Sequence, residues 1–206
     1  MTPVMDAGGA WVATHRGDPY PDVSREPTEA ALALNMEPHP EGCFFREVYR
    51  SPSLVSTTRG WRPSLTCALV MVTSDAASRW HRLESEEVWL HQAGAPIEHY
   101  VLPESGRLQK LVLGPGDLSY HELDMEEPER LVPWVQVPVS AWQAARLVPY
   151  ADDGSVTAVR WGLVMCVVAP GFDFEDFEIG GRRDLLAKHA DVFARLPQLA
   201  TLLPER

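Results

Sequence analysis

Cysteine is scarce in this chain of 206 residues. Its three cysteines, Cys43, Cys67 and Cys166, lie far apart in apolar stretches. No CxxC pair and no Cys/His cluster occurs, which excludes a readable disulfide framework and a zinc finger. Isolated cysteines of this kind are usually small buried residues in a reducing compartment. We therefore expect an intracellular, cytoplasmic protein.

Long hydrophobic runs are also missing. The longest, Trp161 to Pro170, is about half the length that a membrane-spanning helix needs. Residues 1–12 have neither the basic start nor the apolar segment of a secretory signal. These absences predict a soluble chain with no membrane partner.

Positive charge is in deficit. Lysine and arginine number 18 against 29 aspartates and glutamates, which gives a net charge of −11. A partner that binds the nucleic-acid backbone needs clustered Lys and Arg, so nucleic acid is excluded as a partner. Hydrophobic residues make up 45% and charged residues 23% of the chain, as in ordinary globular proteins.

The order of patterns along the chain predicts one domain with two flanking segments. Residues 1–25 have neither helical nor strand period, and we interpret them as a flexible arm or as a strand lent to a neighbouring subunit. A short helix follows Pro27 and ends before Pro38. The folded domain should span residues 26–181, and residues 182–206 should form a C-terminal helical tail.

Between these helices the sequence reads as strands. Short runs rich in Val, Leu, Trp, Tyr and Phe recur about every ten residues, with turn residues between them and no helix, so we predict an all-β barrel or sandwich. The predicted strands are Phe44–Arg50, Leu65–Thr73, Arg79–Leu83, Glu87–His91, Ile97–Leu102, Leu108–Leu113, Arg130–Pro138, Trp142–Val148 and Ala158–Val168.

One frame in the middle of the chain carries functional information. His81 is followed by Glu87 six residues later and by Gly94 seven residues after that, which resembles the first motif of the cupin superfamily. Residues 138–143 (PVSAWQ) fit the spacing of the second cupin motif. The four metal-ligand positions of cupins then fall on His81, Leu83, Glu87 and Gln143.

That set argues against a firmly bound metal, because Leu83 has no ligand atom and Gln143 offers an amide oxygen at best. The weaker alternative is a divalent ion held by His81, Glu87 and His91, since His91 shares a strand face with Glu87 by alternation.

A closer resemblance is to one branch of the superfamily, the cupin-5 or DUF985 family. The matching segments cover about residues 30–180 in order: 38–42 (PHPEG), 45–51 (FREVYRS), 80–82 (WHR), 87–89 (EVW), 142–145 (WQAA) and 168–178 (VAPGFDFEDFE). The resemblance implies a single jelly-roll β-barrel, commonly a homodimer and often without a metal. Barrels of this kind are similar to those of deoxysugar epimerases, which use acid–base chemistry without a cofactor.

The chain departs from the family pattern near the expected pocket, so no relative's substrate can be transferred to it. The departures are Cys43, Phe45, Leu90, Gln92, Tyr100 and Trp134.

His81, Glu87 and Gln143 are the candidate catalytic residues. An imidazole and a carboxyl group on inward-facing strand positions can exchange a proton, and burial brings their pKa values toward neutrality. Gln143 would anchor a carbonyl or hydroxyl group of the substrate. The alternative is a buried hydrogen-bonded pair without turnover.

The candidate substrate-binding residues are less securely placed. Arg46 could pair with an anionic group, Trp89, Trp134 and Trp142 could form flat walls, and His91 would face inward unless a bulge turns it out. Periodicity cannot choose between His99 and its neighbours, and the family frame favours Glu98 and Tyr100 as the inward pair. We interpret the remaining histidines, His15, His39, His121 and His189, as structural or exposed, and residues 172–177 as a packing loop.

Three hypotheses follow. The first is a cofactor-independent enzyme that isomerises, epimerises, cyclises or eliminates on a small oxygenated metabolite, with secondary metabolism as one setting and with His81 and Glu87 as base and acid. The second is a protein that binds a sugar-like or apolar ligand without turnover. The third, disfavoured by Leu83 and Gln143, is a metal-dependent oxygenase.

Overall fold

The computed structural model describes residues 4–5, 11–12, 20–104, 106–115, 131–149 and 159–204. Most of the predicted arm, together with His15 and His121, lies outside these residues.

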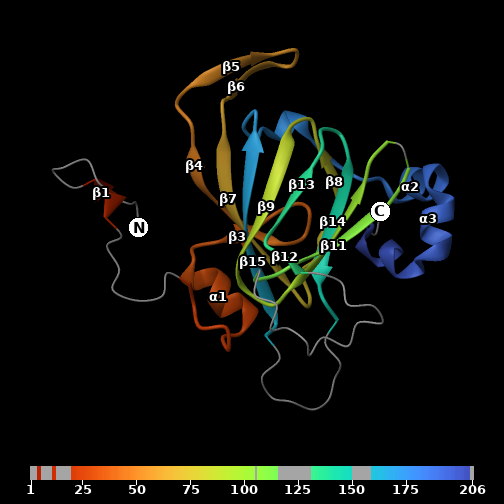
Figure 1. Cartoon of the computed structure of the whole chain (residues 1–206), viewed down its shortest axis with the longest axis horizontal. Coiled ribbons are helices and arrows are strands. Elements are labelled where there is room, and N and C mark those ends of the chain that lie inside the picture. Colours follow the sequence, from red (N-terminus) through yellow and green to blue (C-terminus); the bar gives the residue numbers. More distant parts are fainter. Residues whose placement is uncertain are drawn as a thin grey trace.

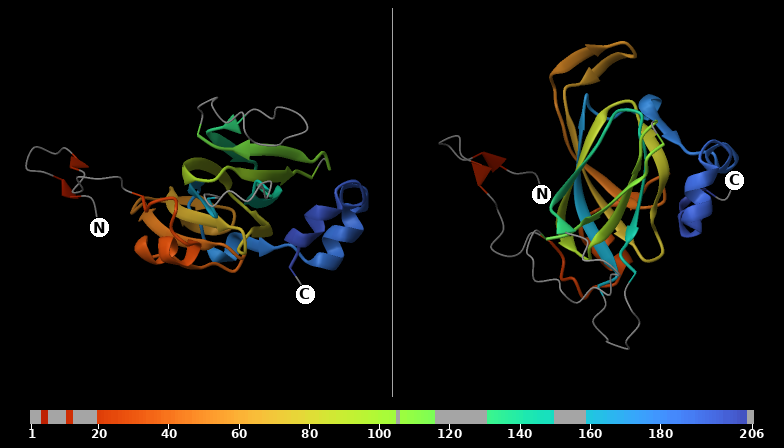
Figure 2. Two further views of the ribbon diagram at one scale, coloured as in Figure 1. Left: turned by 90° about the horizontal axis from the view of Figure 1, so that it is seen from below. Right: turned by 45° about the vertical axis from the view of Figure 1, so that its right-hand side comes forward.

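Two six-stranded sheets face each other in a jelly-roll arrangement (Figures 1 and 2). The first has the order β12-β11-β10-β14-β8-β16 and the second β13-β9-β15-β7-β4-β3. The strands of the first sheet are β8 (Ser78–Leu83), β10 (Ile97–Leu102), β11 (Gln109–Leu113), β12 (Leu131–Val132), β14 (Trp142–Leu147) and β16 (Phe177–Ile179). Those of the second are β3 (Glu37–Pro38), β4 (Phe44–Arg50), β7 (Thr66–Thr73), β9 (Glu86–Gly94), β13 (Trp134–Val137) and β15 (Trp161–Ala169).

The predicted all-β jelly-roll is confirmed, and every predicted strand coincides with one or two strands of the sheets. The run predicted at 130–138 contains two strands, β12 and β13, because Pro133 interrupts it. Proline has no N–H to donate to a strand ladder. The two strands consequently join different sheets.

Two small two-stranded sheets lie outside the sandwich. They pair β1 (Val4–Met5) with β2 (Trp11–Val12), and β5 (Leu54–Thr57) with β6 (Gly60–Pro63). The β5–β6 hairpin extends beyond the upper end of the sandwich in Figure 1. It is tied back by a buried ion pair in which Arg62 Nε donates to Asp176 Oδ2 at 2.8 Å.

Three apolar clusters hold the layers together. The central cluster fills the space between the sheets and includes Trp89, Val101 and Val164. Helix α1 (Pro27–Ala33) covers the outer face of the second sheet, where Ala30 and Ala31 pack with Leu69, Met71, Trp161 and Leu163. The C-terminal helices cover the outer face of the first sheet.

The C-terminal segment forms two short α-helices rather than one. Helix α2 (Arg182–Lys188) ends and α3 (Ala190–Arg195) begins at His189, which has non-helical dihedral angles, and the 3₁₀ helices are η1 (Phe174–Asp176) and η2 (Pro197–Leu202). The break redirects the chain so that Leu185, Phe193 and Leu199 all reach the sheet. None of the described helices is long and apolar enough to cross a membrane.

Candidate active site in the jelly-roll interior

A cavity of about 60 Å³ lies between the two sheets. Its titratable lining residues are His39, Glu41, Glu47, His81, Glu87 and Cys166. The rest of the wall is apolar apart from Thr66, and its aromatic part comprises Phe45, Trp89, Phe172 and Phe177. Because Glu47 is exposed while the other five titratable residues are not, the cavity reaches solvent beside Glu47.

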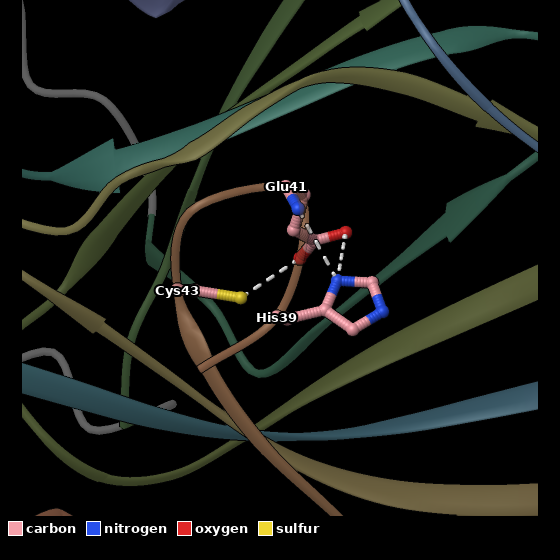
Figure 3. A group of neighbouring side chains, drawn as sticks. All are labelled: His39, Glu41 and Cys43. Carbon is pink, nitrogen blue, oxygen red and sulfur yellow. Dashed lines mark hydrogen bonds and ion pairs between the residues drawn. The ribbon is translucent and has the colours of Figure 1, made fainter. Parts of the chain in front are cut away.

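Glu41 is the centre of a buried polar cluster. It lies in the five-residue loop between β3 and β4, closed by hydrogen bonds from His39 N to Cys43 O and from Gly42 N to His39 O. Gly42 has φ +115°, which only glycine adopts readily, and the turn directs the side chains at 39, 41 and 43 toward one point (Figure 3). The Glu41 carboxylate therefore enters the cavity from a rigid loop.

Four groups surround the Glu41 carboxylate. Its Oε1 accepts from Cys43 Sγ at 2.9 Å and from Ser78 Oγ at 3.1 Å, while Oε2 lies 3.4 Å from His39 Nδ1 and 3.3 Å from His81 Nε2. Burial opposes ionisation, but the charge of His81 and the bond and charge of His39 outweigh it and bring the Glu41 pKa to about 2. Glu41 is thus an anion at neutral pH.

The surroundings of His81 favour a proton on both ring nitrogens. Nδ1 lies 2.7 Å from the carbonyl oxygen of Arg79, which can only accept. Nε2 faces the Glu41 carboxylate, which also accepts. Both ring nitrogens of His81 therefore face acceptors, one a backbone carbonyl oxygen and the other the Glu41 carboxylate.

Glu87 is buried in a different environment. Its Oε2 accepts from Gln143 Nε2 at 2.6 Å, and Gln143 Oε1 lies 3.2 Å from His99 Nε2. Since the amide oxygen can only accept, His99 must donate through Nε2. Burial raises the pKa of Glu87, and the charge of His81 and the Gln143 bond only partly offset that effect.

His99 is a neutral base at the end of this chain. Burial, followed by the charge of His81, lowers its pKa to about 3. Its ring meets Trp89 edge-on with centroids 4.7 Å apart, and its Nδ1 has no hydrogen-bond partner among the described residues.

His81 and Glu87 converge as predicted, but from facing sheets rather than from neighbouring strands. His81 lies on β8 of the first sheet and Glu87 on β9 of the second, and both line the same cavity. Gln143 is the register partner of His81, and its amide crosses the interior to Glu87. Both ends of that amide are occupied by protein groups, so Gln143 positions Glu87 instead of anchoring a substrate.

Two residues of this site escape the sequence-based prediction. The sequence singles out Glu41 only as part of the family-matching segment 38–42. It predicts that His39 is structural or exposed. His39 is in fact nearly buried, lines the cavity and contacts four aromatic rings, those of Phe45, Phe172, Phe174 and Phe177. The signal that could have found both is the alternation of His39, Glu41 and Cys43 between two short strands.

The predicted inward pair Glu98 and Tyr100 is wrong. Tyr100 packs under the C-terminal helices and donates to Glu98 Oε2 at 2.6 Å on the outer face of the first sheet. His99 is the residue that points inward. Trp142, predicted to line the pocket, also lies in the outer cluster, where Arg82 stacks over its ring.

Three other predicted binding residues lie away from the cavity. Arg46 points to the outer face of β4 and donates to the carbonyl oxygen of Leu34 at 2.7 Å, at the end of α1. Trp134 is 56% exposed on the edge strand β13. His91 is half-buried with Nε2 3.3 Å from the Ala95 carbonyl oxygen and does not line the cavity. Trp89 is the predicted tryptophan that does.

The residues at the cupin metal positions do not fit a metal ion. Leu83 lines the cavity without a donor atom, and the Gln143 amide is engaged at both ends. The alternative set His81, Glu87 and His91 is not brought together. A different group could hold an ion, because donor atoms of His39, Glu41 and Cys43 lie within 4.8 Å of one another.

Comparison with known proteins places this geometry in context. The family described as Cupin superfamily (DUF985) matches residues 28–180. A hypothetical protein from Leishmania major is 25% identical, with a TM-score of 0.68 over 88% of this chain and 100% of the other. A protein from Shewanella oneidensis is 24% identical, with a TM-score of 0.67 over 85% and 97% of the two chains. Among curated proteins no match was found.

Proposed function

Because the chain belongs to the cupin superfamily, in its DUF985 family, we propose that it is a cofactor-independent enzyme that moves protons on a small oxygenated metabolite. The reaction would be an isomerisation, epimerisation, cyclisation or elimination. The observation that carries the proposal is one cavity with two buried carboxyl groups of opposite character beside one imidazole.

The protonation pattern assigns roles to these groups. Glu87 is a carboxylate with a raised pKa and therefore a stronger base than an exposed glutamate. His81 Nε2 lies 3.3 Å from Glu41 Oε2, so a substrate atom would have to displace that contact to receive the His81 proton. Glu87 would remove a proton from the substrate and His81 would supply one, which is the reverse of the order expected from the sequence.

Other residues set the geometry of the reaction. Gln143 fixes one oxygen of Glu87 and leaves the other to accept a proton. Trp89, Phe172 and Phe177 form the apolar part of the cavity wall beside these groups. Apolar surroundings lower the local dielectric constant and strengthen the electrostatic contacts within the cavity.

Solvent isotope incorporation tests the proposal even where the product is unidentified. Candidate metabolites that raise the melting temperature would be incubated with the protein in D₂O and followed by NMR. We expect deuterium at one carbon of the true substrate, with the rate reduced about 10²-fold or more in Glu87→Gln and His81→Gln. Glu86→Gln, which changes an exposed carboxyl next to Glu87 in sequence but outside the cavity, is the matched control and should remain active.

The non-catalytic alternative makes the opposite prediction. Ligands that bind tightly to the wild-type protein without deuterium exchange or conversion would identify a binding protein and end the enzyme proposal.

The family resemblance also leads us to propose a homodimer. Light scattering should then give twice the chain mass of 23.0 kDa. A species of the single-chain mass at micromolar concentration would contradict this assembly.

A further inference from the structure

Glu87 differs from the other buried carboxyl groups in having no ion-pair partner among the described residues. These residues contain four buried acidic side chains, Glu41, Glu87, Glu98 and Asp176. Glu41 lies beside two histidines, Glu98 contacts Lys110 and Arg146, and Asp176 contacts Arg59 and Arg62. The side chains that interact with Glu87 by hydrogen bonding are uncharged: the Gln143 amide donates to its Oε2 at 2.6 Å, and Trp89 and Cys166 are its other neighbours.

A buried carboxylate without an ion-pair partner is costly, and a protein normally avoids it. The charge on Glu87 faces a cavity instead of a basic side chain. No lysine or arginine of the described chain lines that cavity, and the His81 imidazole there already contacts Glu41 and the Arg79 carbonyl oxygen. A cationic ligand would supply the partner that Glu87 lacks.

The remaining wall suits the same kind of ligand. Trp89, Phe45, Phe172 and Phe177 present aromatic rings to the cavity. The faces of aromatic rings attract ammonium groups, and the attraction grows when the site is desolvated. The net charge of −11 would further draw cations toward the protein.

We propose that the cavity binds a ligand bearing a nitrogen cation, such as an ammonium group, which pairs with Glu87 against the aromatic wall. This inference rests on the proposed function in taking that ligand as the substrate. The proton that Glu87 removes would then lie near the cationic nitrogen, which acidifies neighbouring C–H bonds.

Isosteric probes of different charge test the inference by binding alone. Benzylammonium, benzyl alcohol and benzoate would be titrated into the full-length protein at neutral pH by calorimetry. We expect benzylammonium to bind about tenfold more tightly than benzyl alcohol, and benzoate to bind most weakly. Glu87→Gln should abolish the preference for the ammonium, whereas the control Glu86→Gln, at an exposed carboxyl on the same strand that does not line the cavity, should retain it.

Several outcomes would overturn the inference. These are equal or tighter binding of the alcohol or benzoate, no binding of benzylammonium at millimolar concentration, and a preference that persists in Glu87→Gln. If Glu87→Gln does not fold, NMR of the wild-type protein tests whether the ligand occupies this cavity. Benzylammonium must shift the indole N–H resonance of Trp89, assigned with Trp89→Phe, and an unmoved resonance refutes the site.

The two proposals can fail separately. Ammonium preference without deuterium exchange on any substrate would uphold the binding site and reject the enzyme. Deuterium exchange on neutral substrates, without a preference for the ammonium probe, would uphold the enzyme and reject the cation-binding site.

Discussion

At the scale of single residues, Glu41 organises the site. It holds four neighbours in place and remains ionised although it is buried. Its pKa is lowered from 4.5 to about 2. A carboxyl group with a depressed folded-state pKa stabilises the protein fully above its unfolded pKa, and that contribution is lost as the pH falls through the folded value.

We therefore expect Glu41→Gln to lower the free energy of unfolding by about 3 kcal/mol at pH 7. The difference from the wild-type protein should shrink between pH 4.5 and pH 2, where Glu41 becomes protonated in both states. Urea unfolding of both proteins at several pH values measures this difference in the free energy of unfolding. A difference that stays constant over this interval would show that Glu41 does not act through its charge.

His99 offers a second pH dependence of the same sign, in a window that begins at a higher pH. Its pKa is lowered from 6.5 to about 3, so between these values the unfolded chain binds a proton that the folded protein does not. Each pH unit of acidification in this window should cost the wild-type protein up to about 1.4 kcal/mol of stability through this group.

His99→Gln removes that loss, and Gln can still donate to Gln143. The stability of the wild-type protein relative to His99→Gln should fall as the pH drops from 6.5 toward 3, as measured by urea unfolding. His189→Gln, in the C-terminal tail, removes a second histidine whose pKa is lowered by burial, so its pH profile should differ from that of the wild-type protein in the same direction. Parallel pH profiles for wild type and His99→Gln would mean that folding does not lower the pKa of His99.

Three of the candidate residues that the sequence motifs specified lie where an inward-facing position was expected. His81, Glu87 and Trp89 all line the cavity. Glu41 could not be recognised because its role depends on a loop that brings it beside a strand about 40 positions later. Only the folded register of β8 against that loop reveals the contact with Ser78 and His81.

At the scale of elements, the alternation of polar and apolar residues does not predict the inward face of a strand when both of its faces are covered. Strand β10 is buried at all six positions. Odd positions such as His99 and Val101 face the interior, and even positions such as Tyr100 and Leu102 meet the C-terminal helices. A strand that is buried on both faces is mostly apolar along its whole length. Its sequence therefore does not indicate which face lines the cavity.

The C-terminal helices are accordingly predicted to be part of the folded unit. Phe193 of α3 is 6% exposed and meets the Trp80 ring edge-on at 6.0 Å. Phe193→Ala should cost about 3 kcal/mol in the free energy of unfolding, because it leaves a void against Trp80. Leu32→Ala on α1, where the side chain is 74% exposed, should cost less than about 0.5 kcal/mol. Equal effects in denaturant titrations would mean that the tail does not support the sheet.

At the scale of the whole molecule, the two-sheet architecture was predictable because each strand carries its own turn signals and apolar run. The β5–β6 hairpin was not predicted. Its strands have four residues each and are mostly exposed, so no buried face imposes a pattern on Leu54–Thr57 or on Gly60–Pro63. Segments held by an ion pair such as Arg62–Asp176 leave little periodicity in the sequence.

That hairpin matters for the behaviour of the molecule in solution. Leu54 and Trp61 are 59% and 67% exposed and lie close together in sequence and space. At pH 7 the net charge of −11 opposes aggregation, but at the isoelectric point near pH 5.0 this repulsion vanishes. Exposed apolar side chains then drive association.

Turbidity of the wild-type protein should therefore peak near pH 5.0. Trp61→Ser should reduce that peak, whereas Val139→Ser, which removes a 50% exposed side chain from a turn outside the hairpin, should leave it nearly unchanged. The comparison separates two causes, since both variants keep the same charge and the same isoelectric point. If Trp61→Ser and Val139→Ser behave alike, the loss of charge alone accounts for association, and the hairpin has no special part in it.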